Sequence, residues 1–258
     1  MLKKLFLLST LIVLIAPTFS SATQKPYIIS GFDDVLRQAE NTGLVKSAIK
    51  MFEQDKTFSG MPELYTGVSA TENNTKFTLV SATSIWFTNR VDEFLTDAHF
   101  PARRLYLRDW VTEWSIEDFK ISHIQDIIKE KPNRQFIVIF DNSDPSLVMA
   151  ETIHTNFPDK VFEVYLRQTI QKTLPASAHP FFTAFDIALN EYRNERLSLP
   201  ELKTVAAAVI KENQTENLFP SYALCPKDYD PCQSAEGEAS SVCAQVKDHV
   251  QALCKTRY

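Results

Sequence analysis

Three clusters of polar side chains follow apolar runs of the sequence, and they are the residues best suited to chemistry. Carboxylates can transfer protons or hold a cation, and hydroxyls can donate hydrogen bonds to an anion. The clusters are Asp33-Asp34 after residues 27–31, Ser81 at the end of residues 76–81, and Asp141-Asn142-Ser143-Asp144 after residues 135–140. They form a candidate site if the fold brings them together.

The apolar runs alternate with segments of helical pattern, which predicts an α/β fold with a mostly parallel sheet flanked by helices. Predicted strands cover residues 27–31, 76–81, 105–107, 135–140 and 161–166, and predicted helices cover residues 42–54, 60–68, 88–98, 116–131 and 145–156. Ligands bind outside the carboxyl ends of the strands in such sheets. All three polar clusters fall at that edge.

The pattern changes after residue 166. Helices are predicted over residues 181–193, 199–213 and 240–253, with a loop over residues 220–237. We therefore expect a signal peptide over residues 1–22, an α/β domain over residues 23–170 and a helical extension over residues 171–258.

The N-terminus has the pattern of an export signal. Lys3 and Lys4 precede an apolar run, Leu5–Ala16, and small residues Ser20 and Ala22 precede a possible cleavage site. The run is shorter than a membrane span, which needs about 20 residues. We expect a periplasmic or secreted protein without a transmembrane segment in its mature chain, and an uncleaved N-terminal anchor is the alternative.

The balance of charge limits the possible partners. The 258 residues carry a formal net charge of −5. Nucleic acids and simple attraction to anionic membranes require a basic surface. We therefore expect no nucleic-acid partner.

All four cysteines lie in the last part of the chain, at Cys225, Cys232, Cys243 and Cys254. An even, clustered set in an exported chain predicts two disulfides, and a zinc site is the alternative. Cys243 and Cys254 are eleven residues apart on one predicted helix, about 16 Å along its axis. That separation is too long for a disulfide, so each should pair with Cys225 or Cys232.

Six segments of residues 27–167 follow one another in the order and near the spacing of a known family: Ile29–Val35 with Thr42-Gly43, Ser59-Gly60-Met61, Leu79–Trp86, Phe100–Arg103 with Leu107-Arg108-Asp109, Phe140–Pro145 and Tyr165-Leu166-Arg167. On these segments the region resembles the catalytic domain of the actin-patch-associated phosphatidate phosphatases, a family of the haloacid-dehalogenase (HAD) type. The resemblance implies a HAD-like, Rossmann-type fold. It also implies Mg²⁺-dependent hydrolysis of phosphatidate or another phosphomonoester through an aspartyl-phosphate.

The resemblance assigns roles to individual residues. Asp33 takes the position of the catalytic acid and base, and Ser81 and Lys120 take the positions that bind phosphate. Asp33, Asp141 and Asp144 would hold Mg²⁺. Three of these residues have a structural alternative: Asp33 as a helix cap, Ser81 as an ordinary strand-end residue and Lys120 as a surface lysine.

Two residues depart from the family pattern. Gly31 stands where the nucleophilic aspartate belongs, and Phe140 replaces a glycine of the metal-binding motif. Glycine has no side chain with which to attack phosphorus. Two hypotheses follow: a hydrolase that is weak or uses water activated by Asp33, or a non-catalytic protein that keeps the fold as a binding module.

Overall fold

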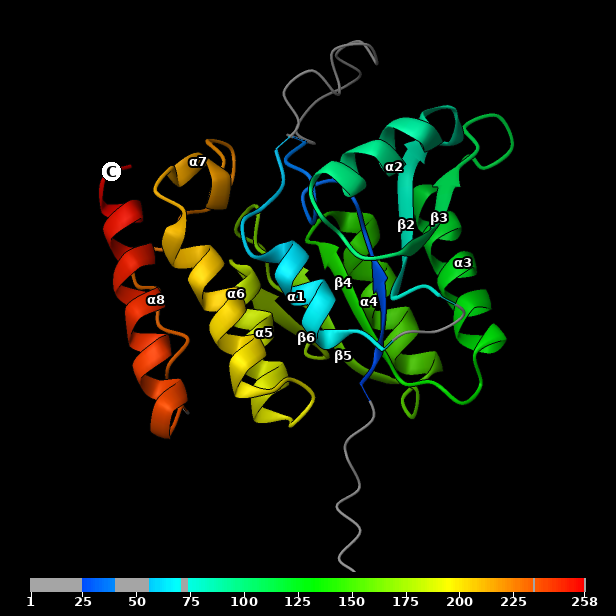
Figure 1. Cartoon of the computed structure of the whole chain (residues 1–258). Coiled ribbons are helices and arrows are strands. Elements are labelled where there is room, and N and C mark those ends of the chain that lie inside the picture. The colour runs from blue at the N-terminus through cyan, green and yellow to red at the C-terminus, as the bar shows by residue number, and fades with distance from the viewer. Residues whose placement is uncertain (1–24, 40–55, 71–73, 234, 258) are drawn as a thin grey trace, which may run out of the picture.

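The computed structural model describes residues 25–39, 56–70, 74–233 and 235–257. The described residues form a six-stranded parallel sheet of order β3-β2-β1-β4-β5-β6, flanked by helices (Figure 1). The predicted α/β class is therefore confirmed. The signal peptide and the helix predicted over residues 42–54 lie outside the described residues.

The predicted strands are present with small changes at their ends. The strands are β1 (Tyr27–Ser30), β2 (Phe77–Ser84), β3 (Arg103–Arg108), β4 (Phe136–Asp141), β5 (Val161–Arg167) and β6 (Ala178–Phe181). The sequence pattern missed β6, because a helix was predicted to begin at Phe181. This short strand lies at the sheet edge and contains Pro180, which an edge strand tolerates.

The helices of the first part of the chain are α1 (Met61–Val68), η2 (Ile85–Phe87), α2 (Thr88–Asp97), α3 (Ile116–Glu130) and α4 (Asp144–Asn156). Those of the last part are α5 (Ala184–Arg193), α6 (Leu199–Lys211), α7 (Thr215–Leu218) and α8 (Gly237–Lys255). Serines cap α3 and α6, because Ser115 and Ser198 accept hydrogen bonds from backbone N–H groups of these helices. Local sequence therefore sets where these two helices begin.

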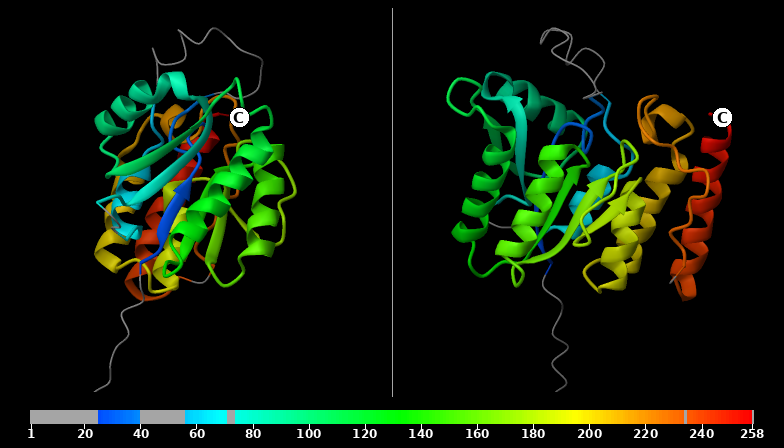
Figure 2. Two further views of the ribbon diagram at one scale, coloured as in Figure 1. Left: turned by 90° about the vertical axis from the view of Figure 1, so that its right-hand side faces the viewer. Right: turned by 180° about the vertical axis from the view of Figure 1, so that it is seen from behind.

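The helices form layers on both faces of the sheet. One core contains β-strand side chains packed against α3 and α4, and the other packs against α1, α5 and α6. Helix α8 packs on α6 as an outer layer (Figures 1 and 2). Strands β1 and β4 are completely buried, as expected for the centre of a parallel sheet.

The extension is held by two disulfides, Cys225–Cys254 and Cys232–Cys243. The prediction that Cys243 and Cys254 each bond to an upstream cysteine is confirmed. No cysteine is free, so none remains for the zinc alternative. Within the described part of the chain, no helix has the length and apolar character needed to cross a bilayer.

Candidate functional site

The carboxyl ends of the three adjacent strands β2, β1 and β4 bring the three polar clusters to one edge of the sheet. Asp33 follows β1, Ser81 and Thr83 lie at the end of β2, and Asp141 is the last residue of β4. The Thr83 hydroxyl donates a 2.9 Å hydrogen bond to Oδ2 of Asp33. The predicted convergence is present between the first two clusters, and Lys120 connects to the third.

Both carboxylate oxygens of Asp33 are bound by neighbouring side chains. Arg37 donates to Oδ1 from Nε at 2.9 Å and from Nη2 at 2.5 Å, while Thr83 binds Oδ2. The Arg37 side chain is buried. Neither Arg37 nor Thr83 was predicted to lie in the site, although the i,i+4 spacing of Asp33 and Arg37 was the available signal.

Ser81 also lies in this hydrogen-bonded group. Its hydroxyl donates to Thr83 Oγ1 at 3.0 Å and accepts from the Thr83 backbone N–H at 3.1 Å. The side chain is buried, with 3% of its surface exposed. Ser81 therefore supports Thr83, which in turn holds Asp33.

Lys120 is a buried lysine rather than the surface lysine of the alternative interpretation. It lies on α3, and its Nζ donates to Ser146 Oγ at 2.9 Å and lies 3.8 Å from Asp141 Oδ1. Burial lowers the pKa of Lys120, while the carboxylates of Asp141 and Asp33 oppose that shift. Both carboxylates therefore favour the charged form of Lys120, against the effect of burial.

The two aspartates after β4 have different surroundings. Asp141 is buried, and its Oδ1 accepts hydrogen bonds from Ser146 at 2.6 Å and Ser143 at 3.1 Å. The Asp144 side chain is 86% exposed and forms a 2.5 Å ion pair with Lys172. The structure therefore brings Asp141 next to Lys120 but does not bring Asp144 into the cluster.

The space in front of Gly31 is occupied by Phe140. An ideal Cβ on Gly31 would lie 2.9 Å from Cδ1 of Phe140, closer than real Cβ contacts, and 3.3 Å from Cγ2 of Val35. Phe140 is fully buried, and its ring lies 5.1 Å from Nζ of Lys120. Gly31 and Phe140 are therefore complementary, because the ring of Phe140 fills the space that a side chain at position 31 would need.

Comparison with protein families tests the resemblance directly. Residues 27–168 match the model of the phosphatidate phosphatase APP1 catalytic domain. The chain belongs to this family. No match was found among curated proteins or among solved structures.

Membership of the phosphatidate phosphatase family implies a Mg²⁺ site, but the described side chains at these strand ends do not form one. The described residues contain no group of three or more His, Cys, Asp or Glu side chains placed to hold a metal ion. Both oxygens of Asp33 are occupied by Arg37 and Thr83, and Asp144 pairs with Lys172. Gly31 supplies no carboxylate. The guanidinium of Arg37 supplies the positive charge that balances Asp33.

Asp34 links the site loop to the extension. Its backbone is in the left-handed region with φ of 57°, which Asp adopts more readily than most residues. Its carboxylate Oδ1 accepts hydrogen bonds from the Tyr222 hydroxyl at 2.6 Å and from the Ala39 backbone N–H at 3.0 Å. Tyr222 belongs to the loop before the first disulfide, so the extension contacts the candidate site through Asp34.

A pH dependence of stability follows from the burial of Asp34, which raises the pKa of this carboxyl above 3.8. The native state then disfavours the ionised form, so stability falls as pH rises from 3.8 through the native pKa. Asp34→Asn keeps a hydrogen-bond acceptor but does not titrate, so its melting temperature should depend less on pH over this range. The melting temperature of Tyr222→Phe should depend more steeply on pH, because the Tyr222 hydroxyl lowers the pKa of Asp34. Thermal unfolding between pH 3.5 and 8 checks both, and a steeper profile for Asp34→Asn would contradict the assignment.

Arg167 provides a second connection to the extension. Its guanidinium lies 3.4 Å from the ring centroid of Phe58, and its Nη2 donates to the carbonyls of Phe182 at 3.0 Å and Leu218 at 3.4 Å. Burial lowers the pKa of Arg167 to about 10. The last residue of β5 thus joins the sheet to α7.

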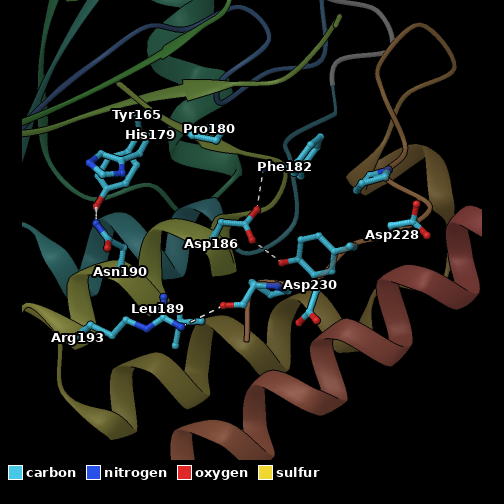
Figure 3. Close-up of a pocket in the computed structure, with 13 residues that line it drawn as sticks. Tyr165, His179, Pro180, Phe182, Asp186, Leu189, Asn190, Arg193, Asp228 and Asp230 are labelled. Carbon is cyan, nitrogen blue, oxygen red and sulfur yellow. Dashed lines mark hydrogen bonds between the residues drawn. The ribbon is translucent and has the colours of Figure 1, made fainter. Parts of the chain in front are cut away.

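A cavity of about 460 Å³ lies away from these residues, between β6, α5 and the loop before the second disulfide (Figure 3). None of the predicted site residues lines it. Within it, Tyr229 donates to Asp186 at 2.5 Å and Arg193 donates to the carbonyl of Pro231 at 3.1 Å. These contacts attach the loop to α5.

Proposed function

We propose that this protein is an exported, non-catalytic member of the phosphatidate phosphatase family that binds a phosphomonoester without hydrolysing it. The observation that carries the proposal is the fit between Gly31 and Phe140. A nucleophilic carboxylate at position 31 is absent, and the ring of Phe140 fills its space. Phosphoryl transfer to the protein then has no acceptor at this position.

The state of Asp33 supports the same conclusion. A general base must reach the proton that it removes, either directly or through one water molecule. The pairing with Arg37 and Thr83 occupies both carboxylate oxygens of Asp33. These three bonds hold the carboxylate between Arg37 and Thr83 and leave one acceptor position, on Oδ2, for a water molecule, which restricts the alternative of direct water attack.

The cationic and hydroxyl side chains at these strand ends favour a phosphate group as the ligand. Lys120 supplies a cation, and Ser81, Thr83, Ser143 and Ser146 supply hydroxyls around the same strand ends. Hydrogen bonds to charged groups are stronger than neutral ones. We therefore favour a phospholipid headgroup or another phosphomonoester as the ligand. The two disulfides support an oxidising, extracytoplasmic location.

The test measures hydrolysis and binding separately. Wild type should release no phosphate from phosphatidate or an aryl phosphate with Mg²⁺, and Asp33→Asn should be equally silent. Calorimetry with inorganic phosphate should detect binding that Lys120→Met weakens about tenfold or more. Lys129→Met is the matched control, because Lys129 lies on the same helix and is 62% exposed.

Two results would overturn the proposal. Phosphate release by wild type that Asp33→Asn abolishes would establish an active hydrolase. Equal phosphate affinity in wild type and Lys120→Met, with unchanged folding, would remove Lys120 from the binding site.

A further inference from the structure

We propose that an exposed surface made of Ile85, Trp86, Val111 and Trp114, here called the tryptophan surface, docks onto a zwitterionic lipid bilayer. Its side chains are 41%, 70%, 61% and 86% exposed in that order. Isolated exposed apolar residues are common, but several large ones together indicate an interaction site.

The tryptophan surface is built from two segments that lie side by side. Ile85 and Trp86 belong to η2 after β2, while Val111 and Trp114 lie in the loop between β3 and α3. Trp110 of that loop joins the segments, because its ring centroid lies 6.2 Å from that of Trp86. Both segments leave the same end of the sheet, beside α2 and above α3 (Figure 1).

This surface is anchored directly to the candidate site. Nε1 of Trp110 donates a 2.9 Å hydrogen bond to the carbonyl of Ala82, which lies between Ser81 and Thr83. Docking through these side chains would place the hydroxyls of Ser81 and Thr83, at the end of β2, next to the phospholipid headgroups. In this respect the inference rests on the proposed function.

The charges around the tryptophan surface favour a neutral bilayer. The Asp109 carboxylate accepts hydrogen bonds from Val111 N–H and the Thr112 hydroxyl within the loop, both at 2.9 Å. Arg90 is paired with Glu93 at 3.9 Å. The whole chain is acidic, with a net charge of −5. Attraction to anionic lipid is therefore weak, and insertion of apolar side chains supplies the affinity.

The identity of the side chains favours a bilayer over a protein partner. Tryptophan has an apolar body and a polar N–H, and it concentrates where lipid headgroups meet acyl chains. Trp86 extends from the short helix η2 and Trp114 from the neighbouring loop. Exposed indoles on such short segments suit insertion into a lipid interface.

The experiment uses the fluorescence of the protein itself. The three tryptophans of the chain are Trp86, Trp110 and Trp114, so the tryptophan emission reports on this surface and on Trp110 beside it. With phosphatidylcholine vesicles we expect a blue shift of emission and co-sedimentation, both insensitive to NaCl between 0.1 and 0.5 M. The vesicles contain no phosphomonoester, so failure here is distinct from failure of phosphate binding.

Substitutions then locate the contact. Trp114→Ala and Trp86→Ala should each weaken vesicle partitioning about tenfold, and the double variant should lose it. Val148→Ala is the control, because Val148 is a 42% exposed apolar residue of α4 on another surface. Circular dichroism checks that each variant folds.

Three outcomes would overturn the proposal. One is an absence of binding to phosphatidylcholine by folded wild type. Another is binding only to anionic vesicles that 0.5 M NaCl removes. The third is a concentration-dependent dimer in light scattering that Trp114→Ala dissociates without any vesicle binding, which would assign the surface to a second copy of the chain.

Discussion

The double variant G31D/F140G is expected to gain phosphate-releasing activity with Mg²⁺, whereas G31D alone is expected to remain inactive. An aspartate at position 31 would restore the nucleophile and the carboxylate that a Mg²⁺ site lacks here, but its Cβ would lie 2.9 Å from the ring of Phe140. The second substitution removes that ring and restores the glycine of the family motif. Activity should therefore depend on both changes together.

The stabilities of the same variants should show the coupling. G31D should lower the free energy of unfolding by about 1–3 kcal/mol through overpacking, and F140G by about 3–5 kcal/mol through the cavity it leaves. In the double variant the new side chain occupies part of that cavity. Its loss of unfolding free energy should therefore be smaller than the sum of the losses of the two single variants. Urea unfolding measures all four proteins of the cycle.

The control for the gained activity is the triple variant G31D/F140G/D33N. Asp33 supplies the acid and base in the family mechanism, so the triple variant should lose any activity of the double variant. Activity of G31D alone at wild-type stability would show that Phe140 does not block the position. That result would contradict the argument from packing.

Removal of the Cys225–Cys254 disulfide is expected to destabilise the protein most among changes in the extension. Its residues are separated by 29 positions, for which loop-closure entropy gives about 3.6 kcal/mol. The Cys232–Cys243 disulfide closes a separation of 11, for which the same relation gives about 2.8 kcal/mol. Urea unfolding of the two paired alanine variants should preserve this order.

The first disulfide has a further structural consequence. Cys254 is fully buried and Cys225 nearly so, at 0% and 4% exposure, so both cysteines also contribute to the core beneath α8. The loop that contains Cys225 also contains Tyr222, which binds Asp34 at the site. Loss of this disulfide should therefore increase hydrogen exchange at Asp34 and Ala39, while loss of the second disulfide should not. Equal protection in both variants would show that Tyr222 holds its position without the first disulfide.

The sequence by itself determined the sheet and the edge at which its polar side chains gather. Apolar runs and helical periodicity are local patterns, and they predicted the central strands to within a few residues. Parallel strands present their carboxyl ends at one edge, so the strand prediction placed Asp33 and Ser81 at that edge. The strand order, which only the structure gives, makes β1 and β2 neighbours there. The failure at β6 has a local cause, since four residues with one proline give little strand signal.

Only the tertiary structure decided what the site can do. The contact between Gly31 and Phe140, the pairing of Asp33 with Thr83, and the burial of Lys120 join residues far apart in the sequence. The outward direction of Asp144 and the exposure of Trp114 likewise depend on how the loops pack. Local patterns specify elements because backbone hydrogen bonds and burial repeat along the chain. The volume and charge at one point in space depend on side chains from several elements, which no single segment of sequence contains.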